Sequence, residues 1–114
     1  MNPDYREAIY AAVKAIPAGK TCAYQDVARL AGLPGRARLV GRALRELPKG
    51  HQLPWYRVTR ADRSLAFDTG SPDFQRQRNL LLDEGVVLVR NRVPSEHYNW
   101  ENDVDFALWG PPPD

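Results

Sequence analysis

The 114-residue sequence contains one cysteine, Cys22, and two histidines, His51 and His97. A single cysteine cannot form an internal disulfide, and no cysteine and histidine stand at the spacing of a metal site. No apolar run approaches the ~20 residues that a membrane-spanning helix requires. Residues 1–4 lack the basic start and apolar stretch of a secretion signal. These absences predict a cytoplasmic protein with no metal, no other cofactor and no membrane partner.

Length and charge narrow the class of protein further. A chain this short is expected to form one domain around one modest core, and we place that domain at residues 1–109 with a flexible tail at 110–114. Residues 1–63 carry 12 Lys and Arg against 5 Asp and Glu, whereas residues 64–114 carry 4 against 9. The basic half favours a polyanionic partner such as nucleic acid. Solvated charged faces are also common, so charge alone leaves the question open.

Apolar periodicity and capping residues predict four helices. Their expected spans, marked by Asn, Ser or Pro at the start or Gly after the end, are residues 3–16, 25–31, 36–47 and 72–84. A short turn containing Gly32 and Gly35 joins the second helix to the third, which is the helix-turn-helix pattern. On the third helix, Arg38, Arg42 and Arg45 are expected to share one outward stripe.

The intervening segments read as short extended stretches. Residues 53–58 are expected to be extended and mostly buried, and residues 61–64 to form a turn. The β-branched run at residues 86–89 predicts a second strand. Helices combined with short strands place the chain in the α/β class.

Four segments stand out along the chain: Ile16-Pro17-Ala18-Gly19-Lys20-Thr21, Ala23-Tyr24-Gln25-Asp26-Val27-Ala28, Ala37-Arg38-Leu39-Val40-Gly41-Arg42-Ala43-Leu44 and Pro54-Trp55-Tyr56-Arg57-Val58, with Glu84-Gly85-Val86 following. In order and at matching spacing, they resemble segments of the O6-alkylguanine-DNA alkyltransferases. The last of the four resembles the family's active-site motif Pro-Cys-His-Arg-Val. Trp55 stands at the position of the acceptor Cys, and Tyr56 at that of the His. This combination in a short chain resembles the alkyltransferase-like proteins, and it implies a winged helix-turn-helix domain like the alkyltransferase C-terminal DNA-binding domain.

The resemblance implies a set of DNA contacts. Arg38 corresponds to the finger that enters the base stack from the minor groove and replaces an extruded nucleotide. Tyr24 corresponds to the tyrosine that presses on the target phosphate. The full DNA-binding set is Tyr24, Arg36, Ala37, Arg38, Gly41, Arg42 and Arg45. From composition alone, the favoured interpretation of Arg38 is an exposed helix charge, and a half-buried core aromatic is a close alternative for Tyr24; the surrounding motif favours the finger for Arg38.

The resemblance also implies a pocket for the damaged base. Trp55 would give apolar contact to an O6-alkyl group, and the carbonyls of Trp55 and Val58 would accept from the guanine amine. The lesion-pocket set is Tyr24, Trp55, Tyr56, Val58 and Arg63, with Arg57 and Glu84 as structural residues beneath it. Without the resemblance, Trp55 reads as a buried aromatic on a core strand.

Three positions depart from the parent enzymes. Leu47 replaces a hinge Asn, Arg42 replaces a Gly, and Arg63 replaces the Gly of an Asp-Gly turn. Arg63 is expected to project towards the pocket. Trp has no thiolate, so covalent alkyl transfer at residue 55 is excluded. Two other sources of enzymatic chemistry, a Cys22 nucleophile and an acidic residue of a glycosylase (Asp26 or Asp62), are weak candidates.

The resulting prediction is a non-catalytic protein that binds O6-alkylguanine in duplex DNA through the minor groove. It would flip the lesion into a pocket, leave it unrepaired and, by resemblance, flag it for nucleotide-excision repair proteins. We expect a monomer that associates with the nucleoid when bound to DNA. The alternatives are a sequence-specific helix-turn-helix regulator and a residual DNA alkyltransferase.

Overall fold

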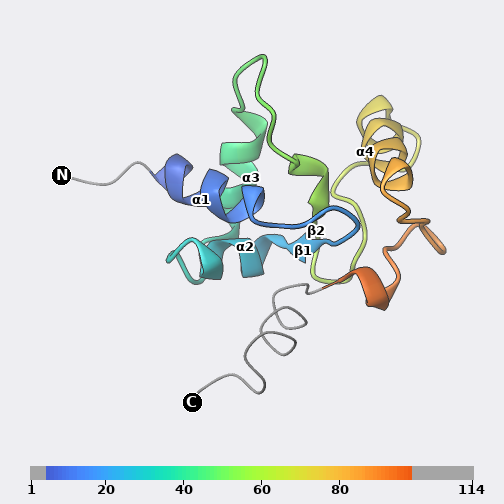
Figure 1. The fold of residues 1–114 in the computed structure, drawn as a ribbon, viewed down its shortest axis with the longest axis horizontal. Coiled ribbons are helices and arrows are strands. Elements are labelled where there is room, and N and C mark those ends of the chain that lie inside the picture. The colour runs from blue at the N-terminus through green and yellow to red at the C-terminus, as the bar shows by residue number, and fades with distance from the viewer. Residues whose placement is uncertain (1–4, 99–114) are drawn as a thin grey trace.

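The computed structural model describes residues 5–98 of the chain. Its elements are α1 (Tyr5–Lys14), β1 (Cys22–Ala23), α2 (Tyr24–Leu30), α3 (Ala37–Arg45), the 3-10 helix η1 (Trp55–Arg57), β2 (Val58–Thr59), α4 (Pro72–Asp83) and the 3-10 helix η2 (Ser95–His97). Helices α1, α2 and α3 form one group, and α4 lies across the molecule from them (Figure 1). Within residues 5–98, no helix is long and apolar enough to cross a membrane.

The first three helices pack around one apolar core. Ile9, Val13 and Ile16 recur at helical spacing and are fully buried, and they meet Val27 of α2 and Val40 of α3. Helices α2 and α3 are joined by a tight turn. Gly32 adopts a left-handed φ of 78°, which glycine reaches at no steric cost, and the next backbone N–H, at residue 33, donates to the carbonyl of Ala28 at 2.8 Å. This turn sets the angle of the helix-turn-helix.

Helix α4 carries a second, smaller core. The Ser71 hydroxyl caps the helix by accepting from the Phe74 N–H at 3.1 Å, and Gly85, with a φ of 85°, follows its end. Phe74 and Leu81 point inward from the helix. The buried members of this cluster are Leu65, Phe74, Leu81, Val86 and Val93.

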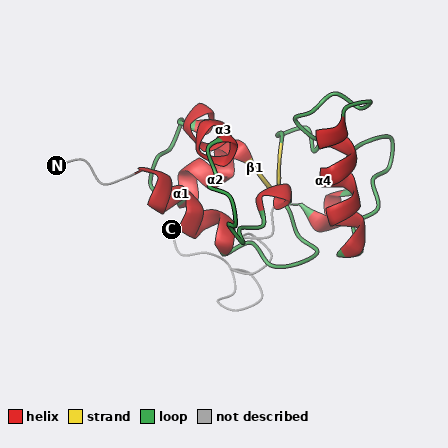
Figure 2. Cartoon of the chain, turned by 90° about the horizontal axis from the view of Figure 1, so that it is seen from above, coloured by secondary structure: helices red, strands yellow, loops and turns green. Residues whose placement is uncertain are grey.

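A short parallel sheet joins the two groups of helices. Cys22 pairs with Val58 and Ala23 with Thr59, so β1 and β2 lie side by side between α1–α3 and α4 (Figure 2). The backbone of Thr21 also bonds the segment at η2, where its N–H donates to the carbonyl of His97 at 2.6 Å. The sheet therefore fixes the start of α2 and the end of η1 relative to each other.

The helix predictions are confirmed within a few residues, whereas two strand predictions are wrong. Residues 86–89 form no strand: Val89 makes only an isolated bridge to Arg92, and the side chains of Val87 and Val89 are 58% and 60% exposed. The chain turns back at Arg90 and Asn91, both with positive φ, so the run has no long partner to pair with. The expected extended segment 53–58 instead forms η1 and becomes a strand only at Val58. The predicted helix start at Asn2-Pro3 and the tail at 110–114 lie outside the described residues.

Candidate DNA-binding site

An open cavity of about 1590 Å³ lies between the helix-turn-helix, the segment 47–56 and α4. Its lining includes Tyr24 from α2, and Ala37, Arg38, Gly41, Leu44 and Arg45 from α3. On the other side it includes Asp73, Arg76 and Leu80 of α4. Most of the residues that the sequence assigns to DNA contact therefore face the same space.

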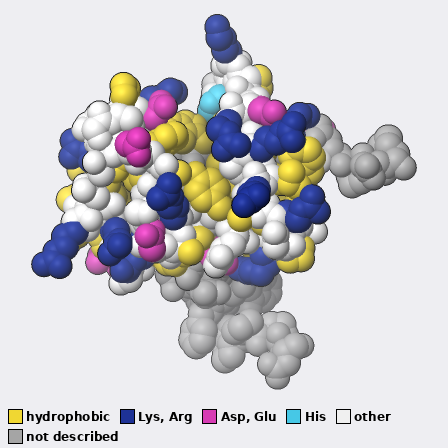
Figure 3. All heavy atoms as spheres, turned by 180° about the vertical axis from the view of Figure 1, so that it is seen from behind, with side chains coloured by type: hydrophobic (Ala, Val, Ile, Leu, Met, Phe, Trp, Pro, Cys, Tyr) yellow, Lys and Arg dark blue, Asp and Glu magenta, His cyan; other side chains and the backbone are white. Residues whose placement is uncertain are grey.

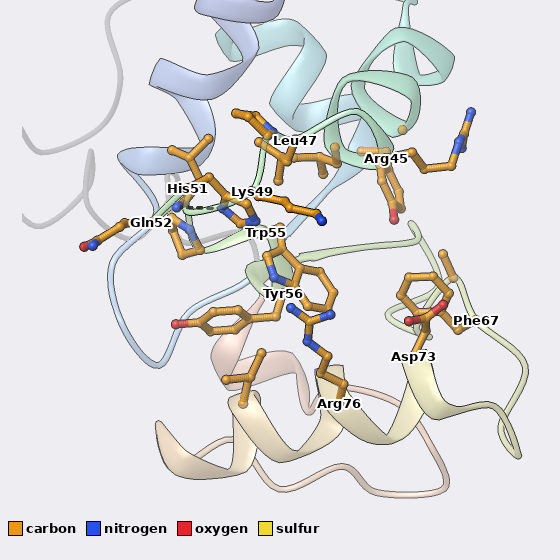
Figure 4. Close-up of a pocket in the computed structure, with 18 of the residues that line it drawn as sticks. Arg45, Leu47, Lys49, His51, Gln52, Trp55, Tyr56, Phe67, Asp73 and Arg76 are labelled. Carbon is orange, nitrogen blue, oxygen red and sulfur yellow. Dashed lines mark hydrogen bonds between the residues drawn. The ribbon is translucent and has the colours of Figure 1, made fainter.

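Trp55 stands in the middle of this cavity, with Lys49 above it and Arg76 below it in the view of Figure 4. The ring is held edge-on by two aromatic neighbours. The ring centres of Tyr56 and Phe67 lie 5.9 and 6.3 Å away, at interplanar angles of 86° and 82°. The guanidinium carbon of Arg76 lies 5.4 Å from the centre of the Trp55 ring, which is cation–π distance. Trp55 is half-buried, so part of its indole is open to a ligand in the cavity.

The cavity is ringed by positive charge. Its cationic lining residues are Arg38, Arg45, Lys49, Arg60 and Arg76, against one carboxylate, Asp73. Seen from behind, an apolar area in the middle of the molecule is bordered by Lys and Arg (Figure 3). Such a surface attracts polyanions over several ångströms and offers apolar contact at its centre.

The cavity-facing side of α3 combines small residues with cations. Ala37 and Gly41 line the cavity together with Arg38 and Arg45. A Cβ at Gly41 would stand 3.4 Å from Nη1 of Arg45, which is an ordinary contact with the end of a flexible side chain. A helix face of this kind lets a phosphate backbone approach closely while supplying charge.

Tyr24 begins α2 and lines the same cavity. Burial raises the pKa of Tyr24, and the nearby charges of Arg60 and Arg45 oppose this shift. The phenol therefore stays protonated at neutral pH and is available as a hydrogen-bond donor to a phosphate oxygen.

A network of charged and polar side chains holds the two residues that follow Trp55 in the chain. The Tyr56 hydroxyl donates to Oε2 of Glu84 at 2.8 Å, and Nε of Arg57 donates to Oε1 of Glu84 at 2.9 Å. Arg57 also donates to the carbonyl of Ile16 at 2.6 Å, and the Gly19 N–H donates to Glu84 at 3.0 Å. The side chains of Arg57 and Glu84 are 14% and 13% exposed. These contacts join η1 to the end of α4 and to the loop that follows α1.

The network also sets the protonation of its members. Desolvation would raise the pKa of Glu84, but hydrogen bonds from Arg57, the Gly19 N–H and Tyr56 outweigh it and lower that pKa. Burial, and then the hydrogen bond to Glu84, raise the pKa of Tyr56. Tyr56 is therefore a neutral donor fixed to a carboxylate and has no group to activate.

Arg36 and Arg42, expected at the DNA face, do not line the cavity. Nε of Arg42 instead donates to Oε2 of Glu46 at 3.4 Å, and Nε of Arg6 on α1 donates to Oε1 of Glu46 at 3.2 Å. Desolvation opposes the effect of these two bonds on Glu46, yet together they lower its pKa. The stripe of three arginines is thus divided, with Arg38 and Arg45 towards the cavity and Arg42 towards Glu46.

Two expected pocket residues, Val58 and Arg63, also do not line the cavity. Val58 is 1% exposed and its carbonyl accepts from Nε2 of Gln77 at 3.1 Å, while the carbonyl of Trp55 accepts from the Val58 N–H. Both carbonyls proposed as acceptors for guanine are therefore already bonded. Arg63 adopts a φ of 73° in a turn, and its carbonyl accepts from the Val93 N–H at 2.9 Å. Its expected projection into the pocket is wrong.

The α4 side of the cavity was missed by sequence reasoning. Asp73, Arg76 and Leu80 lie three and four residues apart, so they share one helical face, and Phe67 precedes them in the loop. The spacing was visible in the sequence. Nothing in it indicated that this face meets Trp55.

Other reactive residues lie elsewhere or have structural contacts. The Cys22 side chain is fully buried in the first core and does not line the cavity. His51 does line it, and its Nδ1 accepts from the Leu53 N–H at 3.2 Å (Figure 4). Asp26 is paired with Arg29 at 3.6 Å. Within residues 5–98, no group of three His, Cys, Asp or Glu could hold a metal ion.

Comparison with known proteins gives a consistent family. Residues 4–86 match the family model described as 6-O-methylguanine DNA methyltransferase, DNA binding domain. The DNA base-flipping protein of Escherichia coli is 42% identical, over 84% of this chain and 74% of its own length. Alkyltransferase-like protein 1 of Schizosaccharomyces pombe is 36% identical, over 90% of this chain and 92% of its own. The crystal structure of that S. pombe protein with damaged DNA containing O6-carboxymethylguanine superimposes with a TM-score of 0.74 at 31% identity, covering 86% of this chain and 97% of that chain.

Proposed function

The chain belongs to the alkyltransferase-like proteins of the 6-O-methylguanine DNA methyltransferase family, and we propose that it recognises O6-alkylguanine in duplex DNA without repairing it. The damaged nucleotide would be turned out of the helix into the cavity around Trp55. The complex of the S. pombe relative with damaged DNA supports this assignment.

One observation carries the proposal: the cavity presents an indole at the position where the parent enzymes present a thiol. Trp55 is half-buried in the cavity, with aromatic neighbours on two sides. An indole has no thiolate and cannot accept an alkyl group, but it offers dispersion and apolar contact to one. The Tyr56 hydroxyl, bonded to Glu84, cannot serve as a general base. The site is therefore suited to holding an alkylated base and not to dealkylating it.

Extrusion of the base is assigned to Arg38 and Tyr24. Both line the cavity from the helix-turn-helix, so an arginine entering the minor groove would lie beside the space that receives the base. A planar guanidinium stacks on neighbouring bases and hydrogen-bonds the orphaned partner. This offsets part of an unstacking cost of a few kcal/mol. Tyr24 would press on the phosphate of the rotated nucleotide.

The other cations that line the cavity would bind damaged and undamaged DNA with equal affinity. Arg45 lies on the same face of α3 as Arg38 and would contact phosphates. The protein would act as a monomeric single domain within residues 1–109, associated with the nucleoid of the cytoplasm when bound. Because it holds the lesion unrepaired, it would flag the damage for nucleotide-excision repair proteins.

Binding to matched duplexes tests the proposal. Duplexes with guanine, O6-methylguanine, a longer O6-alkyl group or O6-carboxymethylguanine at one position should be compared, followed by mass analysis of the protein. We expect tighter binding to every lesion, with larger apolar groups tolerated because buried apolar area adds ~25 cal/mol per Å². An undamaged sequence that outcompetes all lesion duplexes would instead identify a sequence-specific regulator.

A further inference from the structure

Two side chains of helix α4 and its end, Gln77 and Glu84, form hydrogen bonds with the segment that carries Trp55. Gln77 and Glu84 are seven residues apart and so lie on one face of the helix. Glu84, at the helix end, binds the side chains of Tyr56 and Arg57. Gln77 binds the backbone: its Nε2 donates to the carbonyl of Tyr56 at 3.0 Å and to that of Val58 at 3.1 Å.

The amide of Gln77 is an unusual group at this place. The residue is 1% exposed, and its Oε1 has no hydrogen-bond partner among the described residues. A buried amide oxygen without a partner costs free energy, and an apolar side chain of similar length would avoid that cost. Both N–H donors of the amide are used, which fixes its orientation, since a flipped amide would set Oε1 against two carbonyl oxygens. The unpaired Oε1 therefore follows from the amide orientation that allows the two hydrogen bonds to the backbone.

Those two bonds hold the side of the backbone at residues 56–58 that faces away from β1. Tyr56 and Val58 are two residues apart, and both of their carbonyls point to α4, while Val58 pairs with Cys22 of β1. The backbone on the C-terminal side of Trp55 is thus held by β1 on one side and by Gln77 on the other. Trp55 itself is attached directly to this clamped stretch, and Arg76, the neighbour of Gln77, lies over its ring.

We propose that Gln77 is a positioning residue for the lesion pocket. By holding the carbonyls of Tyr56 and Val58, it sets the orientation of η1 and with it the angle at which the Trp55 ring enters the cavity. Gln77 does not line the cavity, so its effect on a bound base passes through Trp55. The consequence for lesion preference rests on the function proposed above, whereas the consequence for the Trp55 ring does not.

Full-length Gln77→Met, Gln77→Asn and Gln75→Met test this role. Methionine keeps the length but donates no hydrogen bond, and asparagine keeps the amide but is one methylene too short to reach both carbonyls. Gln75 is an exposed glutamine on the same helix and serves as the matched control. The two measurements are the ratio of dissociation constants for plain and O6-methylguanine duplexes, and the indole N–H resonance of Trp55, assigned with Trp55→Phe.

We expect Gln77→Met to lose about tenfold of the lesion preference, because two hydrogen bonds are removed, while plain-duplex affinity stays within about twofold. The Trp55 resonance of Gln77→Met should also shift or broaden. Gln77→Asn should give values between those of Gln77→Met and the unsubstituted protein, and Gln75→Met should match the unsubstituted protein in both measurements. A folded Gln77→Met with unchanged preference and an unchanged resonance overturns the proposal, as does an equal loss for both duplexes with that resonance unmoved. If Gln77→Met does not fold, Gln77→Asn decides by the same two measurements. If the unsubstituted protein shows no lesion preference, the proposed function fails, and the Trp55 resonance alone supports or overturns the role of Gln77.

Discussion

Arg76 and Trp55 form a cation–π pair across the cavity, with the guanidinium carbon 5.4 Å from the centre of the ring. Arg76 is exposed on α4, and its side chain points at the indole from the side opposite the helix-turn-helix (Figure 4). A base that enters the cavity would meet the aromatic ring and the cation together. The pair therefore brings a positive charge to the place where an O6-substituent is expected to lie.

Arg76→Ala should weaken binding to O6-carboxymethylguanine duplexes more than to O6-methylguanine duplexes, because only the former carries an anion. A partly screened ion pair between Arg76 and the carboxymethyl group is worth about 0.5–1 kcal/mol, which corresponds to an additional loss of roughly two- to fivefold on the O6-carboxymethylguanine duplex. Fluorescence anisotropy with the two duplexes measures the difference. Arg78→Ala, which removes an exposed cation of α4 outside the cavity, is the control. Equal losses for both variants on both duplexes would contradict a local role for Arg76.

The Glu84 network predicts acid sensitivity of the fold. Hydrogen bonds, from Arg57 above all, lower the pKa of Glu84 in the folded state against the opposing effect of desolvation. The folded state thus favours the carboxylate, so its contribution to stability is present above the ordinary Glu pKa of about 4.3 and is lost as pH falls through the lowered value. Glu84→Gln should cost about 2 kcal/mol at pH 7, less than a fully buried pair, and should flatten the loss of stability below pH 4–5.

Urea unfolding at several pH values between 7 and 3 measures this effect. Asp83→Asn is the matched control, since Asp83 is an exposed carboxylate beside Glu84 in the chain. A Glu84→Gln protein whose stability falls with acid as steeply as that of the unsubstituted protein would show that other carboxylates set the acid limit.

The helices of this fold could be predicted from the sequence because their signals are local. Ser71 before Pro72 and Gly85 after Glu84 mark α4 without knowledge of its neighbours, and the cap at Ser71 is present. The strand prediction at 86–89 failed because a β-branched run indicates preference for extended backbone and not the presence of a partner. Val87 and Val89 are exposed since the chain turns back immediately after them.

The division of the arginines on α3 has a local cause that helical spacing alone overlooked. That spacing places Arg38, Arg42 and Arg45 on one side, but Arg42 and Glu46 are an i,i+4 pair, and Nε of Arg42 donates to Glu46, which Arg6 of α1 also binds. The α4 wall of the cavity, in contrast, is a tertiary feature. The resemblance to the alkyltransferases identified Trp55, yet only the packing of α4 on η1 brings Arg76 over its ring.

The replacement of the acceptor thiol predicts the absence of alkyl transfer. After incubation with O6-methylguanine duplexes, the intact mass of the protein should be unchanged and the lesion should still be present in the recovered DNA. Trp55→Cys should recover little activity, because Tyr56 is hydrogen-bonded to Glu84 and cannot replace histidine as the base. A gain of one methyl group by the unsubstituted protein, on any residue, would show that the chain is an enzyme.

The placement of Arg38 and Arg45 on the cavity side of α3 gives a test of nucleotide flipping. Arg38→Ala removes the group proposed to fill the vacated stack, so a fluorescent base analogue beside the lesion should lose its flipping signal, and lesion preference should fall with it. Arg45→Ala removes a proposed phosphate contact. It should weaken lesion and plain duplexes alike and lower the slope of log affinity against log salt by about one unit, with the flipping signal retained at saturating protein. Arg42, which is paired with Glu46, supplies the control. Of the three variants, Arg42→Ala should change the flipping signal and the salt dependence of affinity least. If Arg38→Ala and Arg45→Ala lose affinity equally for lesion and plain duplexes, Arg38 is only a contact to the DNA phosphates, and the flipping model loses its main support.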